Sequence, residues 1–158
     1  MYVRKSVLLS FVVLAVAIGW LAKTIAQENS SSPAVSYFEG ARIASTLEKS
    51  MSTKITEGKA GSGVYTVMMA HRVKAGEVEL HTLDSDVFYI VSGNATFVTG
   101  GTPVGMKSTA PNEERGQSII GGETRVLSAG DVITIPNGVP HWFKEVKGSF
   151  LYFVVKVR

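Results

Sequence analysis

Short runs of apolar residues, separated by glycine, fill the chain from residue 63 onward. Valine, isoleucine, threonine, tyrosine and phenylalanine dominate these runs, which lie at 64–71, 77–81, 86–92, 95–99, 117–120, 124–128, 132–136, 140–146 and 149–157. Runs of this length and composition predict β-strands, and the glycines between them predict turns. The runs at 87–91 and 150–155 are apolar at every position, which is typical of strands buried between two layers. The pattern predicts an all-β sandwich or barrel.

Local signals outside these runs predict three further elements. Apolar residues recur at helical spacing within 40–49, so we expect one short amphipathic helix on the outside of the domain. The Gly-Asn pair at 93–94 predicts a hairpin turn between two strands. Residues 100–115 contain glycine, proline and polar residues and predict one long loop. A loop of that length in a compact domain is often a lid or a binding element.

The N-terminal segment has the residue order of an export signal. Two basic residues precede an uncharged apolar stretch at 6–22, and the small residues Thr24 and Ala26 follow at positions that suit a signal peptidase. We therefore expect a signal peptide over 1–26, a polar, serine-rich linker over 27–33 and one folded domain over 34–158, in a protein exported to the periplasm or the cell exterior. The alternative is an uncleaved membrane anchor at 6–22, although this stretch is shorter than the roughly 20 residues that span a bilayer.

Charge and cysteine content narrow the range of partners. Removing the signal takes away Arg4, Lys5 and Lys23 from the 16 basic residues and none of the 13 acidic residues, so the net charge falls from +3 to zero. No stripe of basic residues interleaved with aromatic residues follows, which argues against a nucleic-acid partner. The chain has no cysteine, so it forms no disulfide and offers no thiolate ligand. Any metal site must therefore be built from nitrogen and oxygen donors.

Four side chains that commonly bind metals stand at spacings that strands could bring together. Glu79 and His81 are two residues apart, so on a strand they project from the same face. Asp86 opens one apolar run and His141 lies at the start of another, which places both at strand edges. Two imidazoles and two carboxylates could hold a divalent metal.

The spacing of these residues resembles the two motifs of the cupin superfamily, in particular its single-domain members of the cupin 2 type. The first motif places two His, a Glu and a Gly in a frame that here reads Glu79, His81, Asp86 and Gly93. The second motif places Gly, Pro, Gly, His and Asn in a frame that here reads Gly130, Pro136, Gly138, His141 and Glu145. The resemblance covers roughly residues 34–158, and the second motif is the stronger match. The chain departs from the first motif at Glu79, at Asp86, and at Val73, which stands where the family has an opening glycine.

The resemblance implies a double-stranded β-helix, which is the cupin jelly-roll barrel, here with one short N-terminal helix. In metal-bearing cupins the matching positions hold the metal, so the expected ligands are Glu79, His81, Asp86 and His141. Imidazole and carboxylate donors suit Mn, Fe, Ni or Zn. Cupins often dimerise through their sheets, so the resemblance leaves a homodimer open.

Side chains on the same strand faces as these ligands are expected to line the pocket around them. Phe88 and Ile90 share a face with Asp86, and Phe143 shares a face with His141. The sequence allows two interpretations of Arg72. It is either a pocket residue that binds a carboxylate or a solvated residue at a strand end. Glu113-Glu114-Arg115 is expected to be a solvated run of charges.

Two functions from different classes fit this site. The first is an exported enzyme whose divalent metal acts on a small oxygen-bearing organic molecule, in dioxygenase, decarboxylase, isomerase or lyase chemistry. The second is a non-catalytic, metal-free protein that binds a sugar or an organic acid in the same pocket. The fold alone does not separate them.

Overall fold

The computed structural model describes residues 35–60 and 62–158. The signal peptide or anchor expected over 1–26 and the linker expected over 27–33 lie outside the described residues. In the part of the chain that the structure describes, no helix is both long enough and apolar enough to cross a membrane. Residues Val35–Arg158 form one compact unit, and the paragraphs below concern this unit.

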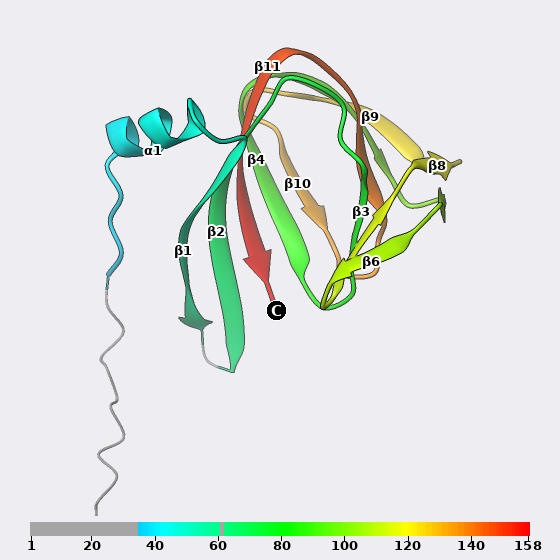
Figure 1. Cartoon of the computed structure of the whole chain (residues 1–158), viewed down its shortest axis with the longest axis horizontal. Coiled ribbons are helices and arrows are strands. Elements are labelled where there is room, and N and C mark those ends of the chain that lie inside the picture. The colour runs from blue at the N-terminus through cyan, green and yellow to red at the C-terminus, as the bar shows by residue number, and fades with distance from the viewer. Residues whose placement is uncertain (1–34, 61) are drawn as a thin grey trace, which may run out of the picture. The chain divides into compact units, whose positions relative to one another are not determined.

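Antiparallel β-strands dominate the unit, with one short helix before them (Figure 1). The helix α1 spans Gly40–Leu47, as the apolar spacing predicted. It lies beside the first two strands. The strands in chain order are β1 (Ser52–Ala60), β2 (Gly63–Arg72), β3 (Val78–His81), β4 (Ser85–Thr99), β5 (Thr102–Val104), β6 (Lys107–Ala110), β7 (Glu113–Gly116), β8 (Ser118–Ile120), β9 (Glu123–Ser128), β10 (Val132–Ile135) and β11 (His141–Val157).

The strand β11 organises the sheet. One path through the sheet runs β1-β2-β11-β3-β7-β6. On its other edge β11 pairs with β4 from His141↔Thr99 to Val157↔Ser85, and β4 in turn pairs with β9 and β10. The sheet curls on itself into a jelly-roll barrel, which confirms the predicted fold class (Figure 1). The strands β5 and β8 form a separate small sheet.

The turn predicted at 93–94 is wrong, because β4 continues through it. Strand β4 pairs with β11 on both sides of Gly93, and the register of that pair shifts between Lys147 and Leu151. Gly93 has a φ of 84°, and a Cβ placed on it would lie 2.1 Å from the carbonyl oxygen of Ser149. The glycine is therefore needed where the backbones of β4 and β11 come together at a bulge, and not at a chain reversal.

The loop predicted over 100–115 is also wrong. This segment contains β5 and β6 and most of β7. The strand β7 pairs with β3 in the register Glu79↔Arg115 and His81↔Glu113, and β6 adds to its other edge. These strands are short and largely polar, so their sequence carries little β signal, but neighbouring strands supply their hydrogen-bond partners: β3 for β7, β7 for β6 and β8 for β5. The part of the expected lid that forms β6 and β7 is in fact a wall of the barrel beside β3.

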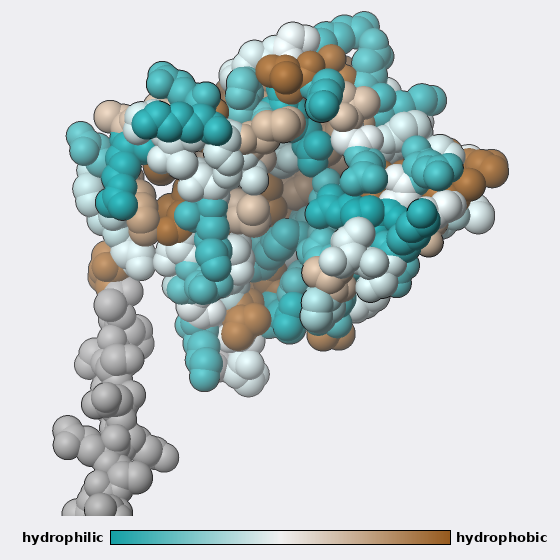
Figure 2. Space-filling view, in the orientation of Figure 1, coloured by the Kyte–Doolittle hydropathy of each residue, from teal (hydrophilic) through white to brown (hydrophobic). Residues whose placement is uncertain are grey.

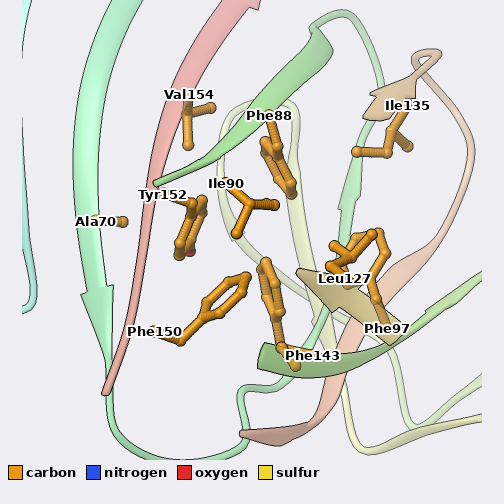
Figure 3. Close-up of a cluster of buried hydrophobic side chains, with 11 residues drawn as sticks. Ala70, Phe88, Ile90, Phe97, Leu127, Ile135, Phe143, Phe150, Tyr152 and Val154 are labelled. Atoms are coloured by element: carbon orange, nitrogen blue, oxygen red, sulfur yellow. The ribbon is translucent and has the colours of Figure 1, made fainter. Parts of the chain in front are cut away.

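Aromatic side chains from β4 and β11 form the centre of the core (Figure 3). The rings of Phe97 and Phe143 have centroids 4.6 Å apart, and those of Phe143 and Tyr152 are 5.0 Å apart. Both apolar runs bury only alternate residues: Phe88 and Ile90 are buried, whereas Tyr89 between them is 47% exposed. The expectation that both faces of these runs are buried is therefore wrong. The face of the protein drawn in Figure 2 is largely hydrophilic, with small hydrophobic patches.

Candidate metal centre

The register of three strands brings the predicted ligands together inside the barrel. Glu79 and His81 come from β3, where their spacing puts them on one face. His141 lies directly opposite Glu79 in the β3–β11 pair. Asp86, near the start of β4, lies opposite Lys156 in the β4–β11 pair. His81, Asp86 and His141 are each no more than 2% exposed.

Glu79, His81 and His141 lie close enough to hold one metal ion. Oε2 of Glu79 lies 3.8 Å from Nε2 of His81 and 3.9 Å from Nε2 of His141. One ligand atom from each of the three residues falls within 4.8 Å of the others. Two donors bound to the same ion at about 2.0–2.2 Å can be at most about 4.4 Å apart, so both carboxylate-to-imidazole distances suit a shared ion. Nitrogen and oxygen donors of this kind suit a divalent transition metal.

His141 has the tautomer that a metal ligand needs. Its Nδ1 lies 3.2 Å from the backbone oxygen of Val139, to which it donates, so Nε2 carries a lone pair. Nε2 is buried and has no hydrogen-bond partner among the described residues. Burial lowers the pKa of His141, and although Glu79 and Asp86 raise it, the pKa stays below its ordinary value. The ring is therefore neutral at pH 7.

Two arginines fix the carboxylate of Glu79. Its Oε1 accepts a hydrogen bond from Arg72 at 2.8 Å and forms an ion pair with Arg115 at 2.7 Å, which leaves Oε2 toward the histidines. Burial raises the pKa of Glu79, but Arg115, His141 and Arg72 lower it more, so its pKa lies below the ordinary value. Glu79 is therefore ionised at neutral pH and held in one orientation.

Asp86, the fourth predicted ligand, is close to the other three but is already paired with the ammonium of Lys156. Its Oδ2 lies 3.2 Å from Nε2 of His81 and 3.7 Å from Nε2 of His141. The ammonium of Lys156 donates to both of its oxygens, at 3.0 and 3.2 Å. Burial raises the pKa of Asp86, but its close neighbour His81 and the charge of Lys156 bring the pKa below its ordinary value.

Three residues at this site were missed by the sequence reasoning. Lys156 follows Tyr152 and Val154 at alternate positions of β11, and both of those are buried. A charge at an inward position of an apolar alternation is the signal that could have found it. Glu113 and Arg115, expected to be solvated, lie on β7 opposite His81 and Glu79. Oε1 of Glu113 is 2.8 Å from Nδ1 of His81, although not in line for a hydrogen bond.

A cavity of about 170 Å³ opens beside the candidate metal ligands. Its walls include Glu79, Asp86, Phe88, Arg72, Arg115, Tyr152 and Lys156. Ile90 and Phe143, which were also expected to line it, lie in the core behind this wall. Arg72 is not a solvated strand end: its guanidinium lies 4.7 Å from the ring centroid of Phe143 and donates to the hydroxyl of Tyr152 at 2.8 Å. Burial raises the pKa of Tyr152 to about 12, so its phenol stays protonated.

Several solved structures are similar to this chain. TT1209 from Thermus thermophilus is 17% identical over 77% of this chain and 96% of that one, at a TM-score of 0.48. A cupin superfamily protein from Desulfitobacterium hafniense DCB-2 is 13% identical over 66% of this chain and 73% of that one, at a TM-score of 0.43. A protein from Acidithiobacillus ferrooxidans ATCC 23270, assigned provisionally to the sugar phosphate isomerases, is 12% identical over 60% of this chain, at a TM-score of 0.41. The chain spans about half, 50%, of that last structure.

The family assignment rests on sequence. A search of curated proteins found no match. The sequence model of the cupin family matches residues 43–158, which include α1 from Ile43 onward, every strand and all four predicted ligands. The chain therefore belongs to the cupin family.

Proposed function

We propose that this chain is an exported cupin that binds one divalent transition metal through Glu79, His81 and His141 and acts on a small oxygen-bearing organic molecule in the adjoining cavity. The observation that carries the proposal is the buried Nε2 of His141, which has no hydrogen-bond partner among the described residues. Leaving a buried polar atom unpaired costs about 1–3 kcal/mol. A metal ion bound to this lone pair would remove that cost.

The surroundings of the three residues support the same role. His141 is held through Nδ1 by a backbone carbonyl, and Glu79 is held through Oε1 by two arginines. Partners of this kind orient metal ligands in proteins. Nε2 of His141 and Oε2 of Glu79 are therefore left free to bind an ion. These two atoms face each other and also face His81.

The cavity suits a small ligand with an oxygen to be polarised. A bound ion would act as a Lewis acid on that oxygen, which is common to the dioxygenase, decarboxylase, isomerase and lyase chemistries of this proposal. The protonated hydroxyl of Tyr152 is available to donate a hydrogen bond, and Phe88 and Val154 supply an apolar wall that restricts water. A volume of about 170 Å³ limits the ligand to a molecule smaller than a drug-sized one.

The second candidate is the metal-free binding protein. One observation favours it: Lys156 already supplies a positive charge to His81 and Asp86. In this alternative the cavity binds a sugar or an organic acid through Arg72, Arg115 and Lys156, without catalysis.

Metal content distinguishes the two candidates. The purified full chain would be incubated with Mn, Fe, Ni or Zn, desalted and measured by elemental analysis. We expect about one equivalent of one metal in the wild type and in His71→Ala, whose imidazole contacts Ser149 instead of the cluster. We expect none in His81→Ala/His141→Ala. Metal-free wild-type protein that still binds sugars or organic acids would support the second candidate.

The export part of the proposal rests on residues 1–26 and has its own test. N-terminal sequencing of material from the cell envelope should find a chain that starts at Gln27. A chain that starts at Met1 would support the membrane anchor instead.

A further inference from the structure

The ammonium of Lys156 lies among the atoms that a metal ion would use. Its Nζ is 2.7 Å from Nε2 of His81, 3.0 Å from Oδ1 of Asp86 and 3.9 Å from Oε1 of Glu113. The side chain is only 19% exposed. Two acidic groups and one imidazole therefore surround this cation, which is the kind of environment that a metal ion would also have.

The contact with His81 excludes a metal ion at the same nitrogen. An ammonium has three donors and no lone pair, so a 2.7 Å contact is attractive only if Nε2 of His81 is the acceptor. The ring proton then sits on Nδ1, facing Glu113 at 2.8 Å. An imidazole nitrogen has one lone pair. It can accept from Lys156 or bind an ion, but it cannot do both.

The structure also offers a place for Lys156 to move to. Lys156 lines the cavity beside the candidate metal ligands. It also lines a second cavity of about 300 Å³. The second cavity is lined by Glu57, Asp84, Tyr65 and Arg158, and the carboxylate of Asp84 is paired with Arg158. Rotation about the side-chain bonds of a lysine can carry its ammonium from one cavity to the other without movement of β11.

We propose that Lys156 is a built-in competitor of the metal ion. Its ammonium holds His81 and Asp86 in the metal-free protein, and an ion binds His81 only when Lys156 turns into the second cavity. This inference rests on the proposed metal function. It predicts that the side chain that protects the empty cluster also weakens its affinity for metal, and that Asp86 becomes available as a fourth ligand once the ammonium has left.

The test is the affinity of the full chain for Zn²⁺ or Mn²⁺, measured by competition with a chromophoric chelator. Lys156→Met removes the ammonium and keeps most of the side-chain volume. Lys147→Met is the matched control, because it removes the same charge from a side chain that is 76% exposed. We expect the Kd of Lys156→Met to fall by about tenfold to a hundredfold, which corresponds to one hydrogen bond to a charged group. The control should be unchanged.

A second pair of variants keeps the test valid if the unpaired Asp86 disturbs folding. Lys156→Met/Asp86→Asn is compared with Asp86→Asn alone, and circular dichroism confirms that both are folded. The double variant should bind metal more tightly than the single variant, because the lone pair of His81 is then free.

Each outcome decides a separate question. An equal Kd in the wild type and Lys156→Met would overturn the competitor role and leave the proposed metal function standing. Metal binding by Lys156→Met but not by the wild type would support the competitor role and overturn the metal function of the natural chain. If none of the variants binds metal, both proposals are wrong.

Discussion

Glu79→Gln is the substitution that tests the electrostatics of the site most directly. It keeps the shape of the side chain and removes its charge. In the wild type, Oε1 of Glu79 accepts a hydrogen bond from Arg72 at 2.8 Å and forms an ion pair with Arg115 at 2.7 Å. Glutamine retains one acceptor oxygen, but Arg72 loses its counter-charge and Arg115 keeps only its pair with Glu113.

The expected cost follows from these contacts. A hydrogen bond to a charged group contributes about 1.5–3 kcal/mol, so counting the Arg115 ion pair at the same strength as the Arg72 hydrogen bond sets an upper range of about 3–6 kcal/mol. The side chains of Arg72 and Arg115 are 18% and 31% exposed, so water replaces part of what is lost. The amide oxygen also keeps one neutral bond. We expect the free energy of unfolding of the metal-free protein to fall by about 2–3 kcal/mol at pH 7.

The pH dependence has a definite sign. Burial raises the pKa of Glu79, but Arg115, His141 and Arg72 bring the pKa below the ordinary value of 4.5. A carboxylate with a lowered pKa stabilises the folded state above its unfolded-state pKa, and this contribution is lost as the pH falls through the lower folded-state value. The difference in stability between the wild type and Glu79→Gln should therefore be constant from pH 7 to about pH 5 and shrink below 4.5.

Urea unfolding in the presence of a chelator, between about pH 7 and about pH 3.5, measures this difference. Glu77→Gln is the control, because Glu77 is exposed and forms no ion pair among the described residues. We expect the control to change stability by less than about 0.5 kcal/mol. A loss below about 0.5 kcal/mol for Glu79→Gln at pH 7, or a loss that does not shrink in acid, would refute the reasoning.

Two further substitutions test the barrel that positions the site. Phe97→Ala removes a ring that is 0% exposed and should lower the free energy of unfolding by about 3–5 kcal/mol, whereas Tyr89→Ala, at a position 47% exposed, should cost about 1 kcal/mol or less. Similar losses in urea unfolding would contradict the assignment of Phe97 to the core. Gly93→Ala places a Cβ 2.1 Å from a backbone oxygen, whereas Gly148→Ala, with a similar positive φ of 73°, meets nothing within 4 Å. Gly93→Ala should therefore cost about 1–3 kcal/mol more than Gly148→Ala in thermal unfolding, and equal costs would argue against a close approach of β4 and β11.

The strands with strong apolar alternation could be predicted from the sequence, whereas the polar strands could not. β2, β3, β9 and β10 lie close to the predicted runs. β1, with the sequence STKITEGKA, and β6, with KSTA, have too few apolar residues to give a period. They are strands because a neighbouring strand offers them a free edge. Hydrogen bonding to an edge depends on the backbone and leaves no trace in the side-chain pattern.

The same distinction applies to the candidate site. Glu79 and His81 could be placed on one face because residues two positions apart on a strand point to the same side. The approach of His141 to Glu79 was predicted from the resemblance to the cupin motifs. No sequence signal paired Asp86 with Lys156 or His81 with Glu113, because each pair depends on strand register, and the members of each pair are separated by many residues.

The sequence alone determined the strand-rich character of the chain, its cupin motifs and the chemical nature of the donors, since these depend on residue types at short spacing. Only the tertiary structure decided which charges meet. The β4–β11 register puts Lys156 opposite Asp86, and the β3–β7 register puts Arg115 opposite Glu79. Register is set by hydrogen bonds and packing over the whole barrel, so the contact of Lys156 with His81 and Asp86 is a property of the folded chain.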